Sequence, residues 1–235
     1  MNKTRLAALV SGCVLFSNFA SAGPLLQFPS GNAAWTVTLT YPDAKATVAP
    51  SPQSGGKPAP HPPVVKKAQK VEVTQVDSFK RIRIIWTDKQ ITERWTVPNL
   101  PVVFEEYSNG AVFPLQASQM EMKMDDLNMP HDASAFAWIT PSSLQSLTPV
   151  SYKGRECFYY RGAASSPSSI MPSTPRAQTI REAWIDSKTL LPVALNTGVS
   201  FCVFTFQDTP AAGSLVPPQK FLDQISYYKR VMGVP

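Results

Sequence analysis

The chain has 235 residues, a formal net charge of +6 at pH 7 and only 16% charged residues. Its length suits one domain with a hydrophobic core, and its basic residues are scattered, which excludes the clustered charge of a nucleic-acid-binding protein. No apolar stretch reaches the roughly 20 residues that cross a bilayer, so we expect no transmembrane segment and no nucleic-acid partner.

Residues 1–22 predict an export signal. Lys3 and Arg5 give the leader a positive start, residues 6–16 form its apolar run, and Ala20-Ser21-Ala22 supplies the small residues that precede a cleavage site. We expect cleavage after Ala22. This would leave 213 residues in one β-rich domain, residues 23–235, located in the periplasm or cell envelope.

The leader also permits a different processing. Val10-Ser11-Gly12-Cys13 is similar to a lipobox, in which Cys13 would carry a lipid and tether the protein to a membrane. The apolar run would then be only residues 6–10, which is shorter than the roughly 7–15 residues of ordinary signals. This length favours cleavage after Ala22 over lipidation.

Most of the remaining chain predicts short antiparallel strands separated by turns. Residues 34–41 alternate apolar with polar side chains and are rich in β-branched and aromatic types, as expected of a half-buried strand. The same alternation, with turn residues between the runs, predicts further strands at 71–76, 81–87, 91–97, 102–107, 111–116, 156–161, 179–186, 191–196 and 200–206.

Two stretches interrupt this pattern, a Pro-rich insertion at 42–67 and a Ser/Pro-rich loop at 163–175. Their composition cannot bury enough surface to offset the entropy of ordering the chain. Helical signals are limited to a short helix at 141–147, capped by Thr140, and helical spacing at 218–232. The expected fold class is therefore mainly β (α+β), a strongly curved antiparallel sheet or half-barrel with one to three short helices.

Cleavage after Ala22 would leave two cysteines, Cys157 and Cys202, an even pair that permits a disulfide in an exported protein. If the strands follow a simple meander, three spacings of ~4.8 Å separate them by roughly 14 Å. A disulfide allows only ~7 Å between Cα atoms, so a bridge would need another strand order or a curved sheet. Two buried free thiols are the alternative.

The sequence indicates no catalytic or cofactor site. Only two histidines are present, His61 and His131, and the common motifs for nucleophilic, zinc-dependent, phosphate-binding and dithiol chemistry are missing. We therefore predict a protein that is not an enzyme and has no cofactor. One alternative is a hydrolase that uses His131 with Asp132, because active sites on loops leave little sequence pattern.

Three methionines at alternate positions, Met120, Met122 and Met124, would share one face of a strand. Closely spaced thioethers are soft ligands that select Cu(I), so a copper-binding protein is an alternative function. The same spacing is typical of a strand that lays methionines on a core, where they fill irregular gaps. We favour the core interpretation.

The expected strands carry more aromatic and branched side chains than a few short helices can cover. A concave apolar face that is left open in this way binds lipid-like or other apolar ligands. An ordinary closed core is the alternative for the same side chains. The candidates for this lining are Trp35, Phe104, Trp184, Leu195, Phe204 and Phe206.

Residues 152–161 and 181–206 resemble the C-terminal strands of the LolA/LolB-like family of periplasmic lipoprotein carriers. The resemblance rests on a Gly-containing strand followed by a hairpin of the type W-x-D-x-x-T-x-x-P-V, here Trp184, Asp186, Thr189, Pro192 and Val193. It implies a half-barrel wrapped around short helices, with an apolar cavity that holds acyl chains in the carriers. It transfers no functional residue, so a lipid ligand follows only by analogy and the protein partner stays open.

Overall fold

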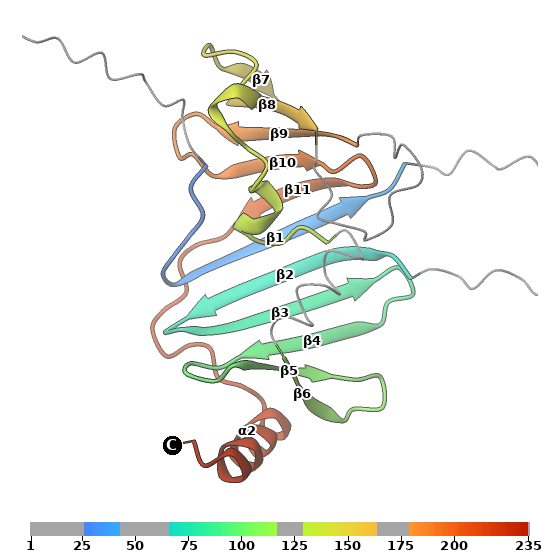
Figure 1. The fold of residues 1–235 in the computed structure, drawn as a ribbon, viewed down its shortest axis with the longest axis vertical. Coiled ribbons are helices and arrows are strands. Elements are labelled where there is room, and N and C mark those ends of the chain that lie inside the picture. Colours follow the sequence, from blue (N-terminus) through green and yellow to red (C-terminus); the bar gives the residue numbers. More distant parts are fainter. Residues whose placement is uncertain (1–25, 43–65, 117–128, 164–178, 235) are drawn as a thin grey trace, which may run out of the picture.

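The computed structural model describes residues 26–42, 66–116, 129–163 and 179–234, whose strands form one antiparallel sheet (Figure 1). The strand order is β6-β5-β4-β3-β2-β1-β11-β10-β9-β8-β7, so the sheet is open and β6 and β7 lie at opposite edges. β1 joins two meanders, because it pairs with β2 on one side and with β11 on the other. The strands are β1 Ala33–Thr40, β2 Ala68–Val76, β3 Phe79–Trp86, β4 Ile91–Thr96, β5 Val102–Glu106, β6 Val112–Gln116, β7 Val150–Tyr152, β8 Arg155–Ala163, β9 Ile180–Asp186, β10 Pro192–Asn196 and β11 Phe201–Phe206.

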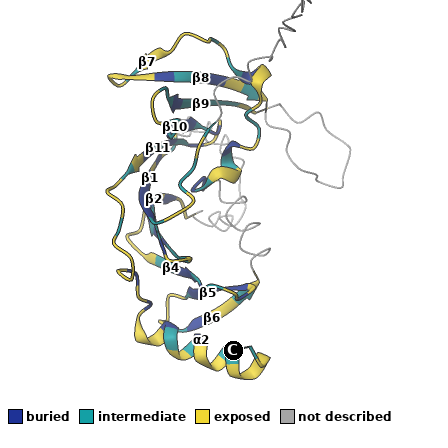
Figure 2. Cartoon of the chain, turned by 90° about the vertical axis from the view of Figure 1, so that its left-hand side faces the viewer, coloured by how far each residue is buried: buried dark blue, intermediate teal, exposed yellow. Residues whose placement is uncertain are grey.

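The expected fold class is confirmed: the protein is mainly β, and its antiparallel sheet bends strongly around one side (Figure 2). Each expected strand has a counterpart at nearly the same residues. The additional strand, β7, was missed because its three residues are too few to show an alternating pattern.

The helices are few and short, as expected. The long one, α2 Gln219–Met232, matches the helical spacing at 218–232 and ends at Gly233, whose φ of 65° is the left-handed conformation of a helix C-cap. The expected helix at 141–147 is only one 3-10 turn, η2 Pro141–Ser143. It ends early because Leu144 turns extended and forms an isolated bridge with Tyr160 of β8.

Alternation along the strands gives the sheet two different faces. On β1, Trp35, Val37 and Leu39 are at most 3% exposed and point to the concave face, the face on which residues 129–147 lie (Figure 2). The concave face holds the larger core. Its buried members outside β1 include Val71, Val73, Ile82, Ile84, Val103, Met129, Phe136, Tyr160, Ile185, Leu195, Cys202 and Phe204.

A smaller core lies on the convex face, where α2 covers the strands at one end of the sheet. Trp95 contacts Phe221 with 6.0 Å between ring centroids, and Phe104 contacts Tyr228 at 5.9 Å. Phe221 is fully buried, so this contact fixes the amphipathic helix to the sheet. β5 is therefore buried on both faces, with Phe104 under α2 and Val103 in the concave core.

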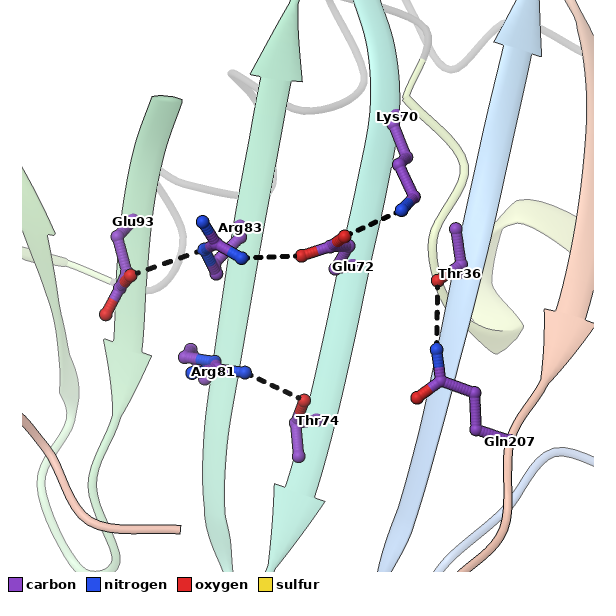
Figure 3. A network of polar contacts seen from close by, with 8 residues as sticks. All are labelled: Thr36, Lys70, Glu72, Thr74, Arg81, Arg83, Glu93 and Gln207. Atoms are coloured by element: carbon purple, nitrogen blue, oxygen red, sulfur yellow. Dashed lines mark hydrogen bonds and ion pairs between the residues drawn. The ribbon is translucent and has the colours of Figure 1, made fainter. Parts of the chain in front are cut away.

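On the convex face of the middle strands, β1 to β4, polar side chains form a network (Figure 3). Arg83 pairs with Glu72 at 2.8 Å and with Glu93 at 3.6 Å, and Lys70 pairs with the other oxygen of Glu72 at 2.8 Å. Partial burial alone would raise the pKa of Glu72, but the neighbouring cations lower it. The three pairs, two of them between strands and one within β2, are partly exposed and contribute little stability. The hydrogen bonds Arg81–Thr74 and Gln207–Thr36 complete the network.

The two cysteines of the expected mature chain are free and buried. Cys157 lies on β8 and Cys202 on β11, three strands apart in the simple meander that the sequence suggested. The pairing registers also place their side chains on opposite faces of the sheet, since Cys202 shares the face of Ala183 whereas Cys157 pairs with Asp186. This arrangement excludes a disulfide between them.

Several sequence-based expectations lie outside the described residues. They are the leader with its cleavage and lipidation sites, residues 43–65 of the Pro-rich insertion, the methionines at 120, 122 and 124, and residues 164–175 of the Ser/Pro-rich loop. Among the helices that the structure describes, none is long and apolar enough to cross a membrane.

Candidate functional site on the concave face

The centre of the concave face is an aromatic and aliphatic surface built by three neighbouring strands. Trp35 of β1 pairs with Phe206 of β11, and Val37 pairs with Phe204. On the far side of β11, Leu195 of β10 pairs with Cys202. Because paired residues of antiparallel strands point to the same face, these side chains form one continuous lining. Four of the six candidates from the sequence therefore lie together, namely Trp35, Leu195, Phe204 and Phe206.

The other two candidates lie on the convex face. Phe104 belongs to the core under α2. Trp184 stacks on Tyr152 with 4.9 Å between ring centroids and also contacts Tyr159 and Phe201. The structure thus does not bring Phe104 and Trp184 to the surface formed by the other four residues.

Two segments of irregular backbone lie over the lining. Phe28, before β1, packs its ring against Trp35, Phe204 and Phe206 with centroid distances of 5.6, 6.3 and 6.0 Å. Phe136 contacts Phe204 at 5.4 Å. Phe136 belongs to residues 129–144, here called the covering segment, which contains η1 Ala133–Phe136 and η2.

The covering segment is attached to the sheet by few hydrogen bonds. Trp35 Nε1 donates to the carbonyl of His131 at 2.8 Å, and the bridge between Leu144 and Tyr160 fixes the other end. Asp132 caps η1 by accepting from the backbone N–H of Ser134. The two single 3-10 turns of the covering segment form few backbone hydrogen bonds of their own, and the segment is held mainly by Met129 and Phe136, which are each 2% exposed in the concave core.

A buried ion pair lies on the concave face beside the lining. Arg94 of β4 and Glu105 of β5 are directly opposed, and Arg94 Nε donates to Glu105 Oε2 at 2.5 Å. The two residues are only 3% and 6% exposed. Nη1 of Arg94 is buried and donates to no acceptor among the described residues. This donor is the most conspicuous unsatisfied group of the concave face, because a buried charged donor without a partner costs free energy.

His131 lies near this ion pair, at the start of the covering segment. Its Nδ1 is 3.2 Å from the carbonyl of Met129, and its Nε2 is 3.4 Å from Asp132 Oδ2. Burial lowers the pKa of His131, and the charges of Lys80 and Arg94 act in the same direction, outweighing Asp132. We therefore assign the neutral imidazole near pH 7.

Asp132 stays ionised in this environment. Burial alone would raise its pKa, but the charge of His131 when protonated, the hydrogen bonds from Ser134 and the charge of Lys80 together lower it. With His131 neutral, the remaining stabilisation comes from Ser134 and from Lys80 Nζ, 3.8 Å from Asp132 Oδ2. Both ring nitrogens of His131 face acceptors of its own segment, and the neutral imidazole can donate its single N–H to only one of them.

The lowered pKa of His131 predicts a stability that falls with acidification. Below about pH 6.5 the unfolded chain binds a proton that the folded chain resists, so unfolding becomes more favourable as the pH falls. Between about pH 7.5 and about pH 5.5, we expect this histidine to reduce the free energy of unfolding by up to about 1.4 kcal/mol. Urea unfolding of the parent and of His131→Asn at both pH values checks this, and an equal pH dependence in the two proteins would contradict it.

Three residues of the site were missed by sequence reasoning. Arg94 alternates with Thr92 and Thr96, a polar series that is typical of a solvent-facing side, while Trp95 on the other side indicates the core. Both sides of β4 are in fact buried, so the pattern was misleading. Lys80 gave no signal in the sequence. Glu105 beside Glu106 is typical of a solvated surface, but Glu105 is only 6% exposed.

Among the residues that the structure describes, no group of three or more His, Cys, Asp and Glu could hold a metal ion.

No family model matches the sequence, and no curated protein matches it either.

Proposed function

We propose that this chain is an exported, non-catalytic protein of the periplasm or cell envelope that binds an apolar, lipid-like ligand on the concave face of its sheet. The observation that carries the proposal is the contrast between this lining and its cover. Trp35, Leu195 and Phe204 form a continuous apolar surface on paired strands. Its described cover consists of irregular segments with two single 3-10 turns.

The two other parts of the proposal have separate support. Export is supported by the leader at residues 1–22. Kinship with the LolA/LolB-like carriers is supported by the hairpin motif and by an open, bent antiparallel sheet of the kind that the resemblance implies. In this scheme the ligand takes the place of Phe28 and Phe136, and the lining keeps its contact with apolar atoms throughout.

Binding of N-phenyl-1-naphthylamine, a neutral apolar fluorophore, tests the proposal. We expect saturable one-to-one binding to the parent protein. Phe206→Ser should weaken it by about tenfold or more, since burial of an aromatic side chain contributes about 1.5–3 kcal/mol. Phe201→Ser is the matched control, because Phe201 is a half-buried phenylalanine of the same strand on the convex face. Equal effects of the two substitutions, or no saturable binding by the parent, would refute the proposal.

A further inference from the structure

The start of the covering segment lies in a cluster of charged side chains. His131 is buried, and its Nε2 is 3.4 Å from Asp132 Oδ2. β3 contributes Lys80, whose Nζ is 3.8 Å from the same oxygen, and β4 contributes Arg94, whose charge also acts on His131. Arg94 is paired in turn with Glu105 of β5. Of these five side chains, the imidazole is the one that ordinarily changes its charge between about pH 5 and about pH 8.

A proton on His131 is unfavourable while the segment lies on the sheet. Burial and the charges of Lys80 and Arg94 oppose the imidazolium form, and the attraction of Asp132, which also pairs with Lys80, does not outweigh them. An imidazole that reaches water takes up a proton with the ordinary pKa of about 6.5. Because the pKa of His131 is lowered in the closed arrangement, acidification below this value favours any conformation in which the side chain has left the cluster.

The two ends of the covering segment are attached to the sheet in different ways. At the first end, the carbonyl of His131 accepts the hydrogen bond from Trp35 Nε1 at 2.8 Å. At the far end, Trp138 lies against Gly162 of β8, where an added Cβ would come within 3.0 Å of the indole ring, and Leu144 bridges to the same strand. The attachments to β8 involve no histidine, so mild acid should weaken the first end and leave the far end in place.

We propose that protonation of His131 releases residues 129–137 from the sheet, while Trp138 and Leu144 keep the rest of the covering segment attached to β8. Burial of Phe136, which contacts Phe204 at 5.4 Å, holds the segment closed near pH 7. Its release in mild acid uncovers that part of the concave face. The inference goes beyond the proposed function and does not depend on it, since the transition belongs to the protein without a ligand.

Hydrogen exchange of the ligand-free protein, followed by NMR and corrected for the intrinsic effect of pH on exchange, tests the proposal. An imidazole with a pKa of about 6.5 in the open form raises the open population about tenfold between about pH 7.5 and about pH 5.5. Protection should fall by this factor at Trp35 Nε1 and at the amide of Ala137, which donates to the carbonyl of Ser134. The amide of Gln145, which donates to the carbonyl of Tyr159 on β8, should keep its protection and serves as the internal control.

Two substitutions assign the effect to one histidine. His131→Asn keeps a polar side chain that does not titrate, so it should abolish the difference between the two pH values. His61→Asn replaces the other histidine of the chain and should leave the difference unchanged.

Three results would overturn the proposal. They are a protection of Ala137 that does not fall in the parent protein, an equal loss at Gln145, which would mean that only global unfolding responds to acid, and a difference that persists in His131→Asn or disappears in His61→Asn. The comparison of Ala137 with Gln145 uses the parent protein alone, so it does not depend on the folding of a variant.

Discussion

Replacing Glu105 alone by leucine, Glu105→Leu, is expected to lower the free energy of unfolding by about 3–5 kcal/mol. The substitution leaves the guanidinium of Arg94 buried at 3% exposure without its counter-charge, and a charge at this depth is poorly solvated. Arg94→Met/Glu105→Leu should instead be as stable as the parent or more stable, because buried pairs gain little over apolar residues of similar volume.

Equilibrium urea unfolding followed by tryptophan fluorescence measures this difference. Lys220→Met is the control, because it breaks an ion pair with Glu106 whose lysine side chain is 46% exposed. An exposed pair of this kind contributes less than about 1 kcal/mol. If Glu105→Leu costs no more than Lys220→Met, the Arg94–Glu105 pair is not buried as described. If the double variant is as unstable as Glu105→Leu, the two charges do not act as a pair.

The second large effect is expected at the helix on the convex face. Phe221→Ala should lower the free energy of unfolding by about 3–5 kcal/mol, the usual cost of truncating a fully buried phenylalanine. Phe221 is 0% exposed and packs on Trp95, so its removal opens a cavity between α2 and β4. The loss should be largely independent of ligand binding, because α2 lies on the face opposite to the lining.

Tyr227→Ala on the same helix provides the comparison. Tyr227 is 55% exposed, with the guanidinium of Arg230 5.7 Å from its ring centroid, so its truncation should change stability by less than about 0.5 kcal/mol. Similar losses for the two substitutions would mean that α2 is not held to the sheet through Phe221. Unchanged binding of N-phenyl-1-naphthylamine by folded Phe221→Ala would support the separation of the two faces.

The sequence predicted the fold well where local signals decide it. Turn residues between short alternating runs located the hairpins, and the spacing of Phe221, Ile225 and Tyr228 located α2. The meander order of β8 to β11 also followed the chain, which is why the argument against a disulfide between Cys157 and Cys202 was correct. These features depend on residues close together in the sequence.

The candidate site was harder to predict because it depends on which face of each strand is covered, and by what. Trp184 and Phe104 are large aromatic residues, which suggests burial. Only the pairing register shows that both side chains point to the convex face, opposite to Trp35. Arg94 shows the reverse error, since a charged residue in an alternating strand normally faces solvent. The covering segment has no periodic pattern, because its turns are single and its position depends on Phe136 and Tyr160.

The two faces of the sheet therefore have separate tasks in this account. On the convex face, α2 closes a second buried core, and Arg83 and Glu72 belong to a partly exposed charged network. On the concave face, irregular segments cover an apolar lining, and the buried Arg94–Glu105 pair lies beside it. Substitutions on the convex face should thus change stability without changing ligand preference.

Native mass spectrometry of the protein purified from the cell envelope of its source, without detergent, tests the central claim most directly. We expect a chain that begins at Gly23 and carries one non-covalently bound lipid, released on gentle activation. A chain that carries no lipid under conditions that keep it folded would contradict the claim.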